Sequence, residues 1–283
     1  MNADTGEGTV VLTSDTQLFE APNWSPDGRW IVVNADGKLF RLEADNPETL
    51  HEISATGLPE LNNDHLISPD GSMHFLSAND GHIYRLPWEG GAAVRVTHPK
   101  EPQRRFRHFL HGISADGTRL AYVGTEMRDG DEWGRRALWE LDLQTGSERL
   151  VGDGFSPADG PEYGPQGLLY FNSEVASSID GHAQIFRRNQ ATATTEQLTF
   201  DERVNWFPHP SPDGRYLVYL SYEPGTLGHP ADLPVIIRAV DNSDGSVRDL
   251  AAVFGGQGTI NVNSWSPDSR RFAFVEYPID PRA

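Results

Sequence analysis

Short apolar runs recur along the chain, and each run follows a polar turn of similar sequence. The turns are variants of the pattern hydrophobic-Ser-Pro-Asp-Gly, and they occupy residues 24–28, 67–71, 113–117, 163–167, 210–214 and 265–269. Proline presets φ for the first turn position, Asp bonds its own backbone, and Gly adopts the positive φ that a tight hairpin needs. The pattern predicts six hairpins, whose second strands lie at residues 29–33, 73–76, 119–123, 168–171, 215–220 and 271–275.

The spacing of these turns predicts the architecture. Successive copies lie 43 to 55 residues apart, which suits one four-stranded propeller blade per repeat. The apolar runs suit strands that are buried on both faces between neighbouring blades. We therefore expect an all-β protein, a six-bladed β-propeller of four-stranded antiparallel blades that forms a single domain over residues 1–283. The expected blades cover residues 19–55, 62–98, 107–152, 159–200, 205–252 and 261–277.

An N-terminal strand is expected to close the ring. Residues 2–6 parallel residues 142–146, which predicts a turn, and residues 9–12 would then form the outermost strand of the sixth blade. Such a closure removes the exposed edge of the last sheet. The third strand of that blade would lie upstream of Met1, so we expect that a few native residues precede it.

The repeat resembles that of TolB-type six-bladed propellers, and the resemblance covers essentially the whole chain. Several segments further resemble a bacterial stand-alone TolB-like subfamily with no settled activity, namely residues 63–65, 111–112, 160–163, 206–210, 228–230 and 254–261. Periplasmic TolB carries an N-terminal α/β domain before its propeller, and no stretch of this sequence would supply one. The resemblance therefore implies the propeller but no Pal-type partner.

The composition narrows the classes of function. A formal net charge of −18 opposes nucleic-acid binding, because that affinity comes largely from Lys and Arg. The chain has no cysteine, which excludes disulfides and Cys nucleophiles, and no apolar stretch long enough to insert into a membrane. Residues 1–6 do not resemble a secretory signal, so a cytoplasmic location is favoured over a periplasmic one. We expect a monomer.

Strand direction predicts which face carries function. Strands alternate in direction within a blade, so the loops between second and third strands lie on the same face as the segments that lead into first strands. Three of these loops are enlarged, at residues 128–134, 175–181 and 223–233. The Ser-Pro-Asp-Gly turns lie on the opposite face, which we expect to be structural.

Polar residues gather in the segments that lead into the first strands and at the ends of the second strands. Convergent polar groups at the mouth of a channel predict a ligand site. The candidate ligand-binding residues are His65, His111, Asp159, Glu162, Asn172, Glu174, His209, His229, Gln257 and Asn261. The expected function is a binding module that takes a polar small molecule such as a carbohydrate, or a protein segment, without a cofactor. Any one of these residues could instead satisfy backbone groups or ordered water in a hydrated channel.

The histidines support an alternative. His65 and His111 both lie three residues before the motif serine, and His209 lies two before, so all three could bind a divalent metal with Glu162. A metal-dependent polysaccharide lyase or hydrolase would then act at the same face, with Glu162 or Asp159 as base. Whether the protein is an enzyme stays open. A serine hydrolase is excluded because the sequence has no Gly-x-Ser-x-Gly elbow.

Three further motifs each have a functional and a structural interpretation. Trp133, Trp206 and Tyr222 could stack on sugar rings or pack in the core. The glycine-rich residues 255–258 lack a following helix, which favours close backbone approach over phosphate binding. The basic residues 104–108 could bind an acidic group or pair with nearby carboxylates.

Overall fold

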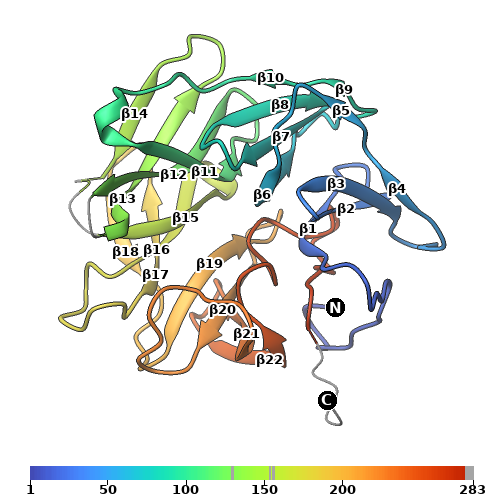
Figure 1. The fold of residues 1–283 in the computed structure, drawn as a ribbon. Coiled ribbons are helices and arrows are strands. Elements are labelled where there is room, and N and C mark those ends of the chain that lie inside the picture. Colours follow the sequence, from blue (N-terminus) through green and yellow to red (C-terminus); the bar gives the residue numbers. More distant parts are fainter. Residues whose placement is uncertain (129–130, 153, 155–156, 278–283) are drawn as a thin grey trace.

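The computed structural model describes residues 1–128, 131–152, 154 and 157–277, and the side chains of all of these except residues 127, 128 and 131–133. Sheets follow one another around a central axis, and the first strand of each lies innermost (Figure 1). No described helix is long and apolar enough to cross a membrane.

Five four-stranded antiparallel sheets form the described blades. Blade one contains β1 (Glu20–Trp24), β2 (Trp30–Ala35), β3 (Lys38–Glu43) and β4 (Leu50–Glu52). Blade two contains β6 (Leu61–Ile67), β7 (Met73–Ala78), β8 (Ile83–Pro87) and β10 (Val94–Arg95). Blade three contains β11 (Phe106–Ile113), β12 (Arg119–Arg128), β13 (Asp131–Asp142) and β14 (Glu148–Val151).

The remaining two blades and the connecting elements complete the fold. Blade four contains β15 (Ala158–Tyr163), β16 (Leu168–Ser173), β17 (Gln184–Asn189) and β18 (Thr195–Gln197). Blade five contains β19 (Val204–Pro210), β20 (Tyr216–Tyr222), β21 (Leu233–Asp241) and β22 (Val247–Gly255). Between these lie a short parallel pair, β5 (Ala55–Thr56) with β9 (Gly91–Ala92), and the 3₁₀ turns η1 (Pro102–Arg104) and η2 (Pro165–Gly167).

The expected number of four-stranded blades is wrong, since the described residues form five such sheets and not six. The sixth motif copy forms its turn, but around it only the isolated bridges Trp265↔Phe272 and Asn2↔Arg271 are found. Residues 9–12 were expected to be a strand and are irregular instead, with Val10 74% exposed. Among the described residues, pairing of the N-terminal segment with this repeat is limited to Met1 to Ala3.

The N-terminal segment nevertheless pairs with the sixth repeat, as expected. The Met1 amine donates to the Phe272 carbonyl at 2.8 Å, the Phe272 N–H donates back to Met1 at 3.0 Å, and the Ala3 N–H bonds Arg270 at 2.9 Å. The turn that follows has the predicted geometry, because Gly6 N–H bonds the Asn2 carbonyl just as Gly146 N–H bonds that of Asp142. These bonds hold the two ends of the chain together.

The repeated turns confirm the chemistry expected of the motif. In blade two the Ser68 hydroxyl donates to Asp70 at 2.6 Å, the Ser72 N–H donates to the same carboxylate at 3.0 Å, and Gly71 has a φ of 72°. The Ser-to-Asp bond recurs in the copies that have both residues, at Ser25, Ser114, Ser211 and Ser266. The fourth copy lacks both residues and forms η2 instead.

The second strands are buried on both faces, as their continuous apolar sequences predict. Every residue of β20 is buried, and so are the last five of β7. The core is therefore a series of apolar layers between neighbouring sheets.

One predicted insertion is not a loop. Residues 128–134 were expected to form one, but β12 runs to Arg128 and β13 starts at Asp131, because pairs such as Glu126↔Arg135 extend the hairpin.

Candidate functional site

A β-bulge in each innermost strand shapes the centre of the ring. The register shifts between Glu20 and Asn23, Leu61 and His65, Leu110 and Gly112, Asp159 and Glu162, and Trp206 and His209. A bulge adds a residue to one strand and changes the direction in which its side chains project. Five of the ten predicted polar residues lie at or next to these bulges, and four of them make contacts between blades; the five are His65, His111, Asp159, Glu162 and His209, and His65 is the exception.

The first such contact joins blades four and five. The Glu162 carboxylate lies 2.5 Å from His209 Nδ1, and both side chains are buried. The Asn263 amide donates to the other oxygen of Glu162, and the Ile260 carbonyl faces His209 Nε2. Both ring nitrogens therefore face acceptors, an arrangement that a protonated imidazole satisfies. Burial raises the pKa of Glu162, against the opposing effects of His209 and Asn263.

The second contact joins blades three and four around His111. Its Nε2 lies 3.4 Å from Asp159 Oδ1, and its Nδ1 lies 3.1 Å from the Asn261 carbonyl. Burial acts to lower the pKa of His111, but the charges of Asp64 and Asp159 outweigh it and raise the pKa to about 9. Asp159 has a lowered pKa, because the His111 hydrogen bond and charge outweigh burial. Burial raises the pKa of Asp64 to about 6.

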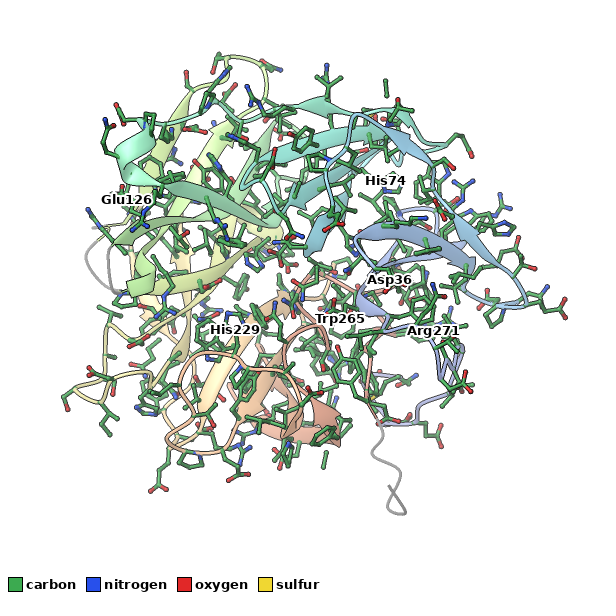
Figure 2. The ribbon with its side chains drawn as sticks, in the orientation of Figure 1. Asp36, His74, Glu126, His229, Trp265 and Arg271 are labelled. Atoms are coloured by element: carbon green, nitrogen blue, oxygen red, sulfur yellow. The ribbon has the colours of Figure 1, made fainter. Side chains whose placement is uncertain are left out.

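A third group of contacts runs across the glycine-rich segment. His229 Nδ1 bonds the side-chain oxygen of Gln257, whose amide donates to Asn63 at 3.0 Å, and Asn63 in turn donates to Glu20 at 3.2 Å. His229 lies on the blade-five side of the centre (Figure 2), with its ring 4.5 Å from that of Trp206, and burial lowers its pKa.

The predicted close approach of this backbone is confirmed. A Cβ at Gly258 would lie 2.5 Å from Glu20 Oε1, and Gly258 has a φ of 90°. The Gly258 N–H donates to the side-chain oxygen of Asn261 at 2.7 Å. Asn261, one of the predicted site residues, therefore holds the backbone of this segment. The segment therefore serves to bring backbone to the channel.

His65 does not join the other histidines. Its side chain is 1% exposed, neither ring nitrogen has a hydrogen-bond partner among the described residues, and burial lowers its pKa to about 3. His74, which lies in blade two away from His229 (Figure 2), also acts to lower the pKa of His65. The difference from His111 arises from the bulges, since His65 pairs regularly with Leu76 whereas His111 is the extra residue of its strand. Among the described residues, no group of three or more His, Asp or Glu side chains could hold a metal ion.

The remaining predicted residues, Asn172 and Glu174, line a depression together with Asp159. Its walls come from blades three, four and five, and its lining includes Asp159, Asn172, Glu174, Arg136 and Trp206. The segment that leads into β15 and the end of β16 thus share one face, as the alternation of strands requires. Arg136 Nη2 lies 3.2 Å from Glu174 Oε1, and the depression is too narrow to admit a water molecule in this state.

Backbone groups fix two of these side chains. Asn172 Oδ1 accepts the Phe207 N–H at 3.2 Å, and Glu174 Oε2 accepts the Gly181 N–H at 2.8 Å. Sequence reasoning missed Arg136, because it lies opposite Thr125 in the part of the β12–β13 hairpin next to the expected loop. A single arginine forms no recognisable sequence pattern, so nothing in the sequence indicates that Arg136 lines this depression.

The aromatic candidates pack in the core. Trp206 and Tyr222 are 1% and 0% exposed and belong to one apolar cluster, so neither offers an open face to a sugar. The Tyr222 hydroxyl donates to the Pro230 carbonyl at 3.2 Å, and the buried Trp206 indole N–H has no partner in the part of the chain that the structure describes. The side chain of Trp133 lies outside the described residues.

No protein-family model matches the chain. An uncharacterized protein of Agrobacterium fabrum, Atu1656, is 36% identical over 272 residues, covering 94% of this chain and 87% of that protein. A solved structure described as "putative TolB" from Agrobacterium tumefaciens is 36% identical with a TM-score of 0.87, covering 98% of this chain and 96% of that one.

More distant structures share the fold alone. TolB from Acinetobacter baumannii has a TM-score of 0.62 at 16% identity, covering 89% of this chain and 56% of that one. An oligogalacturonate lyase in complex with manganese has a TM-score of 0.59 at 15% identity, covering 89% and 71%. The repeated turns, the antiparallel blades and the identity to Atu1656 along nearly the whole chain together place this chain in the TolB-like β-propeller family that includes Atu1656.

Proposed function

We propose that the protein is a binding propeller that takes a carbohydrate at the channel mouth over blades three to five. The observation that carries the proposal is the depression in which Asp159, Asn172 and Glu174 gather beside Arg136. Carboxylates accept hydrogen bonds, a guanidinium donates them, and an amide does both. Sugar hydroxyls also donate and accept, so a hydroxyl-bearing edge of a sugar matches this set of groups.

The ion pair over the depression would open on binding. Arg136 and Glu174 are only 19% and 16% exposed and lie 3.2 Å apart, so a ligand must replace their mutual contact with its own hydroxyl groups. Below them, His111 holds Asp159 by charge and hydrogen bond. The ligand would therefore meet two fixed carboxylates, those of Asp159 and Glu174, and would displace the Arg136 guanidinium from Glu174.

A glycan array tests this function, followed by calorimetric titration of the glycan that binds best. Glu174→Gln keeps the shape of the side chain but loses its charge, and we expect it to weaken binding by about 1–3 kcal/mol. Glu196→Gln makes the same change in the Arg187–Glu196 ion pair on the outer strands of the same blade and should leave binding unchanged. If no glycan binds, or if both variants weaken binding equally, the proposal is wrong.

The sequence also predicts a protein segment as ligand, and nothing among the described residues favours it over a carbohydrate. The metal-dependent lyase or hydrolase is less well supported, because His65 does not join His111 and His209 and the described residues contain no cluster of three or more His, Asp or Glu that could hold a metal ion. Elemental analysis of the purified protein tests this ranking. One equivalent of a transition metal that survives dialysis would reverse it.

A further inference from the structure

Exposed apolar side chains gather over blades four and five, on the face opposite the Ser-Pro-Asp-Gly turns. Among the described residues nine large apolar side chains are exposed, and four of these lie in loops of these two blades. They are Val175 and Ile179 in the segment 175–182, Phe200 in the segment 198–203 and Leu227 in the segment 223–232, with exposed fractions of 52%, 63%, 77% and 72%. Loops between second and third strands and connections into first strands share this face. Single exposed apolar side chains need no explanation, but a contiguous group marks an interaction site.

Contacts tie the loop between β16 and β17 to both of the other segments. His182 Nε2 donates to the Asp201 carbonyl at 2.9 Å, which joins this loop to the segment between β18 and β19. A Cβ at Gly181 would lie 2.7 Å from Leu227 Cδ2, so the loop also packs against the one between β20 and β21. The four exposed side chains therefore belong to one surface, the apolar patch.

Further bonds fix this surface. Arg203 Nη1 lies 2.8 Å from Glu223 Oε1, and Arg203 Nε donates to the Ser221 hydroxyl at 2.9 Å, so the segment before β19 is held to the end of β20. Within the β16–β17 loop, the Ser177 hydroxyl donates to His182 Nδ1 at 2.9 Å. Each of the three segments is thus held by the other two, and a partner would meet a surface that is already formed.

The apolar patch is separate from the depression that Asp159 and Glu174 line. None of its four side chains contributes to that lining. Apolar side chains also offer no hydrogen bonds to sugar hydroxyls. The patch therefore fits a second partner and not the carbohydrate proposed for the depression.

Carboxylates outnumber basic groups around the apolar patch. Its three segments contain five carboxylates, one arginine and no lysine. Two of the five form ion pairs, Glu223 with Arg203 and Asp201 with Arg238. The other three, which form no ion pair with any described residue, are Asp180, Glu202 and Asp232.

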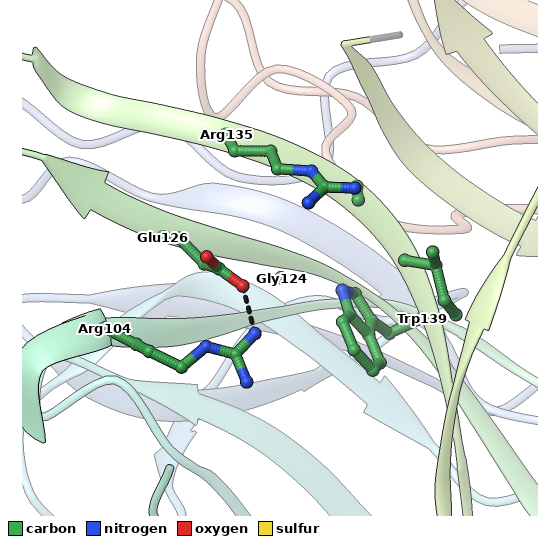
Figure 3. A pocket seen from close by; sticks show the side chains of 7 residues that line it. Arg104, Gly124, Glu126, Arg135 and Trp139 are labelled. Atoms are coloured by element: carbon green, nitrogen blue, oxygen red, sulfur yellow. Dashed lines mark hydrogen bonds and ion pairs between the residues drawn. The ribbon is translucent and has the colours of Figure 1, made fainter. Parts of the chain in front are cut away.

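The same face over blade three differs, because its carboxylates have a basic partner. Beside the hollow that Trp139 lines, Glu126 pairs with Arg104 (Figure 3), and Glu101 lies 3.7 Å from the same guanidinium. Exposed apolar side chains and unpaired carboxylates thus occur together over blades four and five. This combination favours an occupant that is both apolar and basic.

We propose that the apolar patch docks a segment of a partner protein that presents apolar side chains beside Lys or Arg. The apolar side chains cover the four exposed ones, and the basic groups meet Asp180, Glu202 and Asp232. The same carboxylates oppose an anionic lipid surface. They also oppose a second copy of this chain, because a two-fold interface brings the same charged patch of each copy together.

Fluorescence anisotropy with a labelled amphipathic peptide of about 14 Leu and Lys residues, in about 0.15 M salt, tests this surface. We expect it to bind, and analogues with Ser for Leu or Glu for Lys to bind at least tenfold more weakly. Leu227→Ser and Ile179→Ser should each weaken binding of the Leu–Lys peptide by about tenfold, because each removes an apolar side chain that becomes buried in the complex. Glu202→Gln should weaken it by about two- to fivefold, the size of a surface ion pair.

Two matched variants lie away from the patch and should bind the peptide as the wild type does. Val94→Ser removes an apolar side chain that is 48% exposed on the outer strand of blade two. Glu48→Gln removes one exposed carboxylate before β4, so it controls for the general attraction between a basic peptide and an acidic protein.

Absence of binding to the Leu–Lys peptide at about 100 μM would contradict the proposal, and so would equal binding of either analogue. Equal losses in Val94→Ser and Leu227→Ser, or in Glu48→Gln and Glu202→Gln, would also contradict it, because binding would then not depend on the patch. Sedimentation of the free protein gives an independent test. A dimer that dissociates in Leu227→Ser would make the patch a contact between copies of this chain and overturn the proposal.

Discussion

Replacing His111 with Asn should change how the stability of the protein depends on pH. In the folded protein the carboxylates of Asp64 and Asp159 outweigh burial and raise the pKa of His111 to about 9, whereas an unfolded His titrates near 6.5. The charged ring therefore stabilises the folded state fully below about pH 6.5, and this contribution is lost as the pH rises towards 9. At about 1.4 kcal/mol for each pKa unit, the contribution amounts to about 3 kcal/mol.

Urea unfolding followed by tryptophan fluorescence, at pH values from 6.5 to 9.5, measures this contribution. The Asn side chain can still donate to the Asn261 carbonyl but leaves two carboxylates facing each other. We expect the variant to be less stable than the wild type by about 3 kcal/mol at pH 6.5, with a gap that narrows towards pH 9.5. His98→Asn, at an exposed position, should show no gap. A gap that stays constant with pH, or that widens, would refute the reasoning.

Three further predictions follow from the fold. Asp70→Ala removes the acceptor of the Ser68 hydroxyl, so it should lower the melting temperature and leave glycan affinity unchanged; reduced affinity at an unchanged melting temperature would contradict the assignment of faces. Gly112→Ala places a Cβ 2.6 Å from the Pro161 carbonyl oxygen and should cost about 1–3 kcal/mol in urea unfolding, while a variant as stable as the wild type would disprove that contact. Deleting residues 1–5 should speed amide exchange at residues 270–272, and unchanged exchange would show that the terminal pairing does not hold them.

The sequence predicted the blades well because their signals are local. Each Ser-Pro-Asp-Gly copy sets its own hairpin through contacts within five residues, as the bonds of Ser68 and Asp70 illustrate. The sixth repeat pairs with residues at the other end of the sequence, as the Asn2↔Arg271 bridge shows, and no local pattern indicates how far such pairing extends. The β12–β13 hairpin of blade three is longer than expected, because strand pairing continues through positions such as Glu126 opposite Arg135. The polar composition of this stretch does not indicate that the strands continue.

Strand alternation alone predicts that the polar segments lie on one face, and the segment that leads into β15 and the end of β16 do so. The pairing of individual side chains could not be predicted, because it depends on where each bulge falls. His65 and His111 have the same distance from the motif serine, yet only His111 is the extra residue of its strand and meets Asp159. A shift of one residue turns a side chain to the other face of a sheet, so equal spacing does not ensure equal direction.

The proposed function requires the ligand to bind at the channel mouth of blades three to five. Hydrogen-exchange mass spectrometry of the protein, with and without the glycan that binds best on the array, tests it most directly. We predict slower exchange in peptides that contain residues 135–137, 157–160 and 172–174, and no change in those that contain the turns at 24–28 and 67–71. Slower exchange confined to the Ser-Pro-Asp-Gly turns, with none at the channel mouth, would contradict the claim.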